Sequence, residues 1–82
     1  MTDVDLVVRL MAEIMEVPPE KIDPKRPFSE LFTATGADSL RQLELMSEIE
    51  RTYQILLPED LSVIERLTPH QLVYNIDNGN YR

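Results

Sequence analysis

The chain has 82 residues, a net charge of −7 at pH 7 and 43% hydrophobic residues. This length fits one domain with a small core, and the apolar content excludes a disordered chain. The eight basic residues are scattered, so the chain lacks the clustered Lys and Arg that nucleic-acid binding requires. Because the chain contains no cysteine, disulfides and thiolate metal sites are excluded as well.

The sequence carries no targeting or membrane-spanning signal. No apolar run approaches the length of a transmembrane helix, and residues 1–5 lack the basic and apolar regions of a signal peptide. We therefore expect a cytoplasmic monomer that binds no membrane. Its own Met1 and short C-terminal tail lead us to expect a free-standing protein. Its acidic surface favours partners that present basic patches.

A first helix is predicted over about residues 3–16, capped by Thr2 or Asp3 and stopped by Pro18 and Pro19. Apolar residues recur there at helical spacing and form one stripe: Val4, Val7, Leu10, Met11 and Ile14.

A long connection is predicted over residues 17–38. Four prolines argue against a continuous helix, whereas large apolar residues such as Phe28 and Phe32 predict that the connection packs onto the body. We expect a short helical turn over residues 29–32, capped by Ser29, and irregular chain over residues 33–36.

Two further helices follow. One begins at Asp38 or Ser39 and runs to about Tyr53, since no Gly or Pro interrupts it. Residues 55–57 form an apolar tether closed by a proline. The window 59–65 then predicts a short helix with two apolar anchors, Leu61 and Ile64.

The last helix begins with Thr68 as N-cap and Pro69 as first helical residue. Its core face comprises Leu72, Val73 and Ile76. It ends over residues 77–79, where Asn78 or Gly79 takes the left-handed conformation, and residues 80–82 are expected to be a loose tail. No strand is predicted. The sequence thus predicts an all-α, small four-helix bundle (three main helices plus a short third one, with a long first loop) in a single domain over residues 1–82.

The helix over about residues 39–53 has two distinct faces. Its core stripe falls within an arc of about 100° on an ideal helix and comprises Leu45, Met46, Ile49 and Tyr53. Leu40 and Leu43 lie outside this arc, on a face predicted to be solvated, together with Glu44, Ser47, Glu50 and Arg51. Two leucines rimmed by charge and next to Ser39 indicate a small docking patch.

Ser39 has two interpretations. Ser and Asp before an apolar helix are ordinary caps, but the free N–H groups and the dipole of a helix start also favour a bound phosphate. A hydrolase nucleophile would need a base, and the only histidine, His70, is interpreted as a surface residue. The Gly-Asp-Ser-Leu hydrolase motif is interrupted by Ala37, and the chain is too short for that fold.

Carboxylates also occur in pairs, as Glu44 with Glu48 and as Glu59 with Asp60. Without a histidine nearby or the loop geometry of a cation site, we interpret both pairs as solvated surface and predict no metal site. An ion pair of Glu48 with Arg51 is expected on the helix surface.

Taken in order, these segments make the chain resemble the acyl and peptidyl carrier proteins. The resemblance covers nearly the whole length. It rests on Gly-Ala-Asp-Ser-Leu at 36–40, Leu-Glu-Leu-Met at 43–46, Leu-Pro-Glu at 57–59 and Leu-Thr-Pro at 67–69.

The resemblance implies a carrier and not an enzyme. Ser39 would receive 4′-phosphopantetheine from coenzyme A through a phosphopantetheinyl transferase, and Asp38 would help in that complex. The arm's thiol would hold an acyl or aminoacyl group as a thioester, supplied by a loading enzyme and passed to a downstream synthase or transferase. Leu40, Leu43, Glu44 and Ser47 would contact partner enzymes. The interior, which shelters cargo in some members, would be lined by Leu45, Met46, Ile49 and Leu57.

Some residues depart from the pattern of fatty-acid carriers. Residues 33–35 look inserted, and Arg41 and Arg51 stand on a helix that is more uniformly acidic in those proteins. We therefore expect a dedicated pathway, such as polyketide or nonribosomal peptide synthesis, and the Thr-Pro start of the last helix leans toward peptidyl carriers. The alternative is a small helical interaction module without a prosthetic group, whose Leu40–Leu43 patch is a static docking site.

Overall fold

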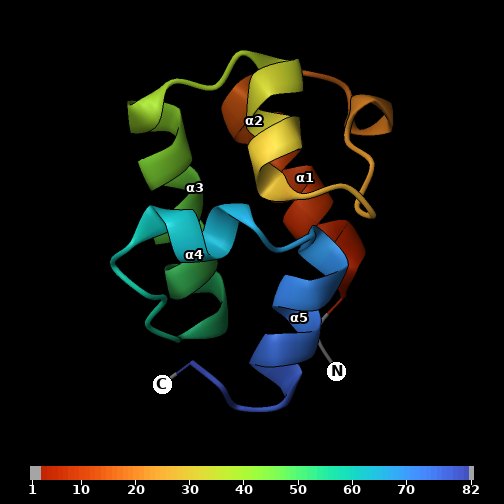
Figure 1. The fold of residues 1–82 in the computed structure, drawn as a ribbon. Coiled ribbons are helices and arrows are strands. Elements are labelled where there is room, and N and C mark those ends of the chain that lie inside the picture. The colour runs from red at the N-terminus through yellow and green to blue at the C-terminus, as the bar shows by residue number, and fades with distance from the viewer. Residues whose placement is uncertain (1–2, 82) are drawn as a thin grey trace.

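The computed structural model describes residues 3–81, and within them the chain is helical with no strand (Figure 1). The elements in chain order are α1 (Val4–Met15), a 3-10 turn (Pro19–Lys21), α2 (Phe28–Thr35), α3 (Ser39–Tyr53), α4 (Leu61–Glu65) and α5 (Pro69–Asp77). The predicted all-α fold is confirmed. None of the described helices is both long and apolar enough to cross a membrane.

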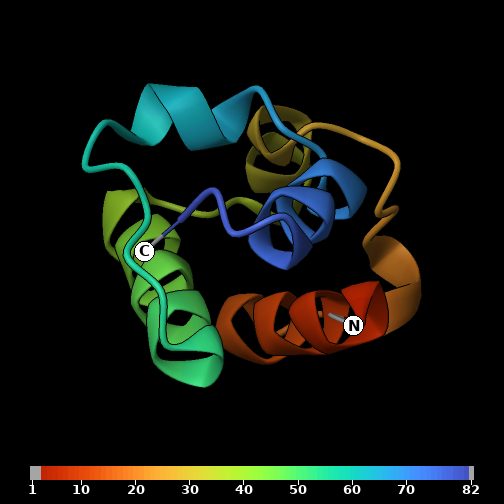
Figure 2. The same ribbon diagram turned by 90° about the horizontal axis from the view of Figure 1, so that it is seen from below.

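The five helices share one core. Each contributes a fully buried side chain, namely Val7 from α1, Phe28 from α2, Leu45 from α3, Ile64 from α4 and Leu72 from α5. Helix α1 packs against both α3 and α5, and α2 packs against α4. Viewed from below, α1 and α3 form two sides of the bundle, with α5 lying inside the angle between them (Figure 2).

Helix α2 corrects the prediction for the long connection. The expected short turn is an eight-residue helix that includes Thr33 and Thr35, which were predicted to be irregular. The threonine hydroxyls donate hydrogen bonds to carbonyls one turn earlier, over 3.1 Å to Ser29 and 2.8 Å to Leu31. The expected cap is also wrong, because Ser29 lies inside the helix and the capping position belongs to Pro27, which makes no side-chain cap.

The buried face of α1 is wider than the predicted stripe. Val7 and Met11 are buried as expected, but Val8, Ala12 and Met15 are buried as well. Leu10, Ile14 and Val4 pack against the edge of the core and stay half-buried. The helix ends where Glu16 takes the left-handed conformation (φ 57°), and Pro18 and Pro19 follow outside it.

Predicted capping residues lie at the starts of three helices, and at α3, where the sequence left Asp38 and Ser39 open, the cap is Asp38. The carboxylates of Asp3 and Asp38 accept hydrogen bonds from backbone N–H groups of α1 and α3. Thr68 forms a reciprocal capping box with Gln71 at the start of α5. The alternative cap, Thr2, lies outside the described residues.

The segments after α3 agree with the prediction in outline. Leu57 is buried at the end of the tether, and Ile64 anchors the short helix α4, which is shorter than the predicted window. At the end of α5, Gly79 and not Asn78 takes the left-handed conformation, with φ 69°.

The C-terminal tail is not loose over its described part. The Asn75 side chain donates to the Tyr81 hydroxyl over 3.1 Å, and the Asn80 N–H donates to the Asn75 carbonyl over 3.1 Å. The half-buried Tyr81 ring packs against the core, which explains why the chain turns back. Arg82 lies outside the described residues.

Candidate functional site

Three helix ends meet at one end of the bundle. The last turns of α1 and α2 and the first turn of α3 lie together at the top of Figure 1. A recess of about 220 Å³ lies among them, lined on one side by Met15 and Glu16 and on the other by residues 35–38 and Arg41. Ser39, the first residue of α3, follows this junction directly.

The Ser39 side chain is exposed, and its hydroxyl makes no hydrogen bond within residues 3–81. The preceding residue, Asp38, accepts a hydrogen bond from the Arg41 N–H over 2.9 Å. In the described chain, the N–H groups of Ser39 and Leu40 have no such partner. Free N–H groups at the positive end of a helix favour an anion. The site therefore offers an open hydroxyl beside a favourable position for a phosphate.

Asp38 is the N-cap of α3, one of the two interpretations that the sequence offered for an Asp and a Ser at this position. Its side chain caps α3, and its backbone carbonyl accepts the N–H of Gln42 over 3.0 Å. The Gln42 amide group reaches back to the carbonyl of Ala37 over 3.1 Å. These bonds hold the segment that leads into Ser39.

Arg41 lies on the first turn of α3 and reaches across to α1. Its guanidinium donates to the backbone carbonyl of Ile14 and, over 3.2 Å, to the carboxylate of Glu16. From the sequence, Arg41 was expected only to change the surface charge of this helix. Its contacts are made across the helix junction, between residues far apart in sequence.

The two faces of α3 lie as predicted. Leu45, Met46 and Ile49 are buried, whereas the side chains of Leu40 and Leu43 are 65% and 56% exposed. Two residues differ from the predicted faces. Tyr53, assigned to the core, is only half-buried, and Glu50, assigned to the outer face, is half-buried because its carboxylate accepts the Leu57 N–H over 2.8 Å.

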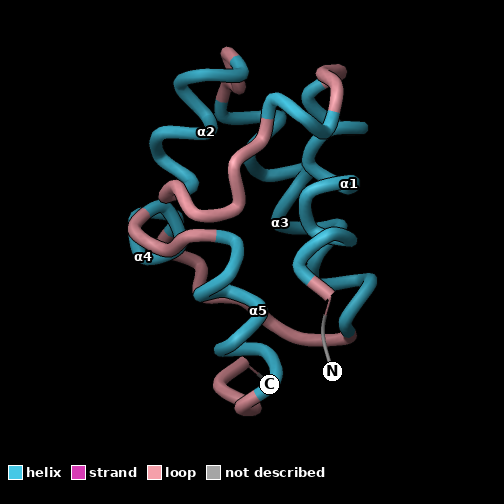
Figure 3. Tube along the Cα trace, turned by 90° about the vertical axis from the view of Figure 1, so that its right-hand side faces the viewer, coloured by secondary structure: helices cyan, strands magenta, loops and turns pink. Residues whose placement is uncertain are grey.

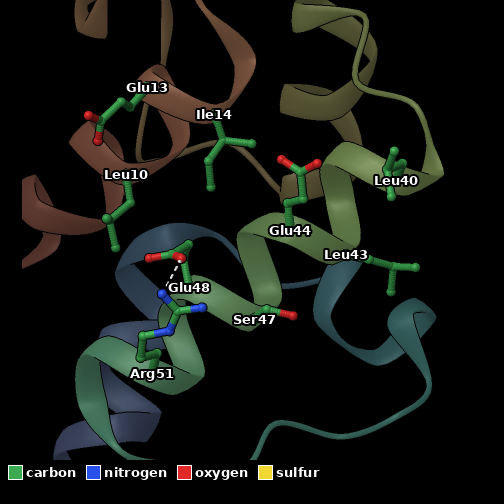
Figure 4. A pocket seen from close by; sticks show the side chains of 9 residues that line it. All are labelled: Leu10, Glu13, Ile14, Leu40, Leu43, Glu44, Ser47, Glu48 and Arg51. Carbon is green, nitrogen blue, oxygen red and sulfur yellow. Dashed lines mark ion pairs between the residues drawn. The ribbon is translucent and has the colours of Figure 1, made fainter.

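The exposed face of α3 continues into a groove of about 540 Å³ that α1 also lines (Figure 4). Leu10 and Ile14 of α1 were predicted to lie in the apolar stripe that faces the core, and their position in a groove was not predicted. The sequence shows that these two residues are one helical turn apart, but it does not give the angle at which α1 meets α3. Figure 4 shows both side chains pointing from α1 toward α3, with Ile14 across from Glu44 and Leu10 across from Glu48.

The groove carries more negative than positive charge. Within the described chain, the carboxylates of Glu13 and Glu44 have no ion-pair partner. Glu48 pairs with Arg51 over 3.2 Å, which confirms the predicted ion pair. An apolar surface with free carboxylates is suited to a partner with apolar and basic side chains.

The other candidate chemistries find no support in the described residues. His70 is exposed on the first turn of α5, and its side chain makes no hydrogen bond to Ser39. The Asp60 carboxylate caps α4, and hydrogen bonds from the Ser62 hydroxyl and N–H lower its pKa. Within residues 3–81, no group of three or more metal-binding side chains is placed to hold an ion.

Comparison with protein families agrees with this geometry. The family model described as "Phosphopantetheine attachment site" matches residues 5–73, which run from α1 into α5. The chain therefore belongs to this family, whose members covalently carry a 4′-phosphopantetheine group and act as carriers, not as catalysts. No solved structure matches the chain.

Proposed function

We propose that this chain is a carrier protein whose phosphopantetheine arm is attached to the hydroxyl of Ser39. The observation that carries the proposal is the exposed hydroxyl at the start of α3, which has no hydrogen bond to any described residue and lies next to the N–H groups of Ser39 and Leu40, which have none either. These residues fit the group, because the phosphate of the arm would lie at the positive end of the helix.

Attachment would form a phosphodiester bond at the Ser39 oxygen. The pyrophosphate bond of coenzyme A would break, its adenosine bisphosphate half would leave, and the transferase would accept the serine proton. The attached arm supplies a thiol, which this cysteine-free chain lacks and which can hold an acyl group as a thioester. Asp38 contributes by capping α3 and so holding the turn that presents the hydroxyl.

The proposal includes a surface for partner enzymes, namely a transferase, a loading enzyme and a downstream synthase or transferase. Leu40, Leu43, Glu44 and Ser47 are all exposed on α3 beside the attachment site. A carrier needs such an accessible patch because several enzymes must dock next to the same arm. The groove residues Leu10 and Ile14 extend this surface onto α1.

The proposed pathway is a specialised one, such as polyketide or nonribosomal peptide synthesis. Two observations support it. Residues 33–35, which look inserted relative to fatty-acid carriers, complete helix α2 beside the attachment site, and Arg51 adds a positive charge to the outer face of α3. The assignment of residues 1–82 to a single carrier domain, the cytoplasmic location and the monomeric state remain predictions from the sequence.

The test is intact-mass analysis after incubation with coenzyme A and a broad-range phosphopantetheinyl transferase. We expect the protein to gain the mass of one phosphopantetheine group. Ser39→Ala should abolish the gain, whereas Ser29→Ala, at another exposed serine on a neighbouring helix, should retain it. If Ser39→Ala still gained this mass, the group would be attached to another residue and the proposal for Ser39 would be wrong. No gain with several active transferases would favour the static interaction module.

A further inference from the structure

We propose that Arg41 is the positioning residue of the attachment site: its guanidinium ties the end of α1 to the first turn of α3 and thereby fixes the Ser39 hydroxyl for the transferase. The inference rests on the proposed function, because it concerns how efficiently Ser39 is modified.

The end of α1 needs a donor from outside the helix. The last carbonyls of a helix have no partner within it, and a cation near them is stabilising. Helix α1 has no basic residue in its last turn. Arg41 supplies what is missing, since its Nη1 donates to the Ile14 carbonyl, 27 residues earlier in the chain.

A second contact fixes the direction of the guanidinium. Nη2 of Arg41 lies 3.2 Å from the Glu16 carboxylate. The Glu16 side chain is 76% exposed, so this ion pair alone would contribute little. Together with the bond to Ile14, however, it makes a two-point contact that suits the planar guanidinium and that a lysine ammonium reproduces poorly.

The same residue also binds the segment that leads into Ser39. The Arg41 N–H donates to Asp38 over 2.9 Å, and the neighbouring Gln42 side chain donates to Ala37 over 3.1 Å. Ser39 therefore lies between two anchored parts of the chain. The segment before it, Ala37 and Asp38, is bonded to α3, and Arg41 after it is bonded to α1. Loss of the Arg41 side chain removes the link between these two supports.

Arg51 provides a matched comparison on the same helix. It carries the same charge, but within residues 3–81 its one ion pair is with Glu48, three residues away on α3, and its side chain is 77% exposed. Arg41→Met and Arg51→Met each raise the net negative charge by one. Only the first removes a contact between helices, so a difference between the two variants reports geometry and not charge.

The experiment measures kcat and KM for arm transfer by the broad-range transferase, together with amide hydrogen exchange of the full chain without the arm. Arg41→Met should lower kcat by about tenfold, because a small displacement of a reacting atom is costly. KM should change little, since the exposed leucines of α3 remain in place. The Gln42 amide should exchange several-fold faster, while amides in α5 are unchanged.

Three further variants complete the test. Arg51→Met should match the wild type in Gln42 exchange, and because Arg51 lines the groove, any effect of this variant on arm transfer should fall on KM and not on kcat. Arg41→Lys should recover part of the lost kcat. Glu16→Gln removes the charge of one contact and leaves the hydrogen bond from Arg41 to Ile14. It should therefore lower kcat by less than Arg41→Met does. This variant also tests the proposal if Arg41→Met folds poorly.

The proposal is overturned if Arg41→Met keeps the wild-type kcat and exchange, if Arg51→Met loses as much, or if the loss appears only in KM. Failure of the proposed function gives a different result, because the wild type itself would then take no arm on Ser39. In that case the role of Arg41 in modification is rejected too. The hydrogen-exchange rate of the Gln42 amide then decides whether the Arg41 side chain stabilises the first turn of α3.

Discussion

Ser39 and Asp38 have different roles in the proposed attachment site. Asp38 uses its carboxylate to cap α3, which leaves the hydroxyl of the next residue without a structural bond in the described chain. A serine that capped the helix itself would have its oxygen occupied. The first turn of α3 is therefore capped by one side chain, while the hydroxyl of the next residue stays accessible.

Tyr53 is an unsatisfied residue at the other end of α3. Its hydroxyl is buried and has no hydrogen-bond partner within residues 3–81. Burial raises the pKa of Tyr53, and the nearby carboxylates of Asp3 and Asp77 raise it further. A buried hydroxyl without a hydrogen-bond partner lowers the stability of the folded state. Tyr53 therefore stabilises the fold less than a phenylalanine would at the same position.

We expect Tyr53→Phe to raise the free energy of unfolding by about 1 kcal/mol at pH 7, since it removes the unsatisfied hydroxyl. Because the folded pKa lies above the unfolded value of about 10, the wild type should lose stability as pH rises past 10, and the phenylalanine variant should lose less. Urea denaturation at pH 7 and above pH 10 measures both effects. Tyr74→Phe, at a residue 68% exposed, should behave like the wild type.

At the scale of the element, α2 shows how packing overrides a weak local signal. The four prolines argued against a continuous helix, and only a short turn was expected, but Phe28, Leu31 and Phe32 recur at helical spacing and are all buried. The Phe28 N–H also donates to the Leu67 carbonyl over 2.8 Å, which fixes the helix start against the segment before α5. Gly36 ends the helix in the left-handed conformation, with φ 70°.

Gly36→Ala should lower the free energy of unfolding by about 1 kcal/mol, because an L residue is disfavoured at this φ. A Cβ at this position meets no heavy atom within 4 Å, so the cost comes from the backbone alone. Gly36→Asn should cost less, since asparagine tolerates the left-handed conformation. Thermal and urea unfolding compare the variants, and equal losses for both would contradict a backbone origin.

At the scale of the whole molecule, the acidic charge and the exposed apolar face occur together. The net charge is −7, and Glu13 and Glu44, which have no ion-pair partner among the described residues, line the groove between α1 and α3. Leu43 lies on the rim of this groove with its side chain 56% exposed. Exposed leucines next to carboxylates favour docking of a partner surface that is both basic and apolar. Because these leucines are exposed, they contribute little to the packing of the core.

Leu43→Asp should therefore leave the helical CD spectrum and the unfolding midpoint nearly unchanged, but lower kcat/KM for arm transfer by about tenfold. Leu56→Asp is the matched control, because Leu56 is 68% exposed in the connection after α3 and lies outside the groove. It should transfer at nearly the wild-type rate. Unfolding of Leu43→Asp, or an equal loss in Leu56→Asp, would contradict a docking role for Leu43.

Much of this molecule follows from local spacing. The start of α3 at Asp38 or Ser39, the cap Thr68, and the exposure of Leu40 and Leu43 were all predicted correctly. Each depends on residues within about one or two turns of one another, where helix periodicity and capping chemistry act directly.

Other features were decided only when the helices packed. The bond from Arg41 to Ile14 joins residues 27 apart, the Glu50 carboxylate accepts an N–H from beyond its own helix, and the groove exists because α1 meets α3. Helical spacing places a residue on a face, but the neighbour of that face depends on how the burial of one shared core sets the angles and registers between helices.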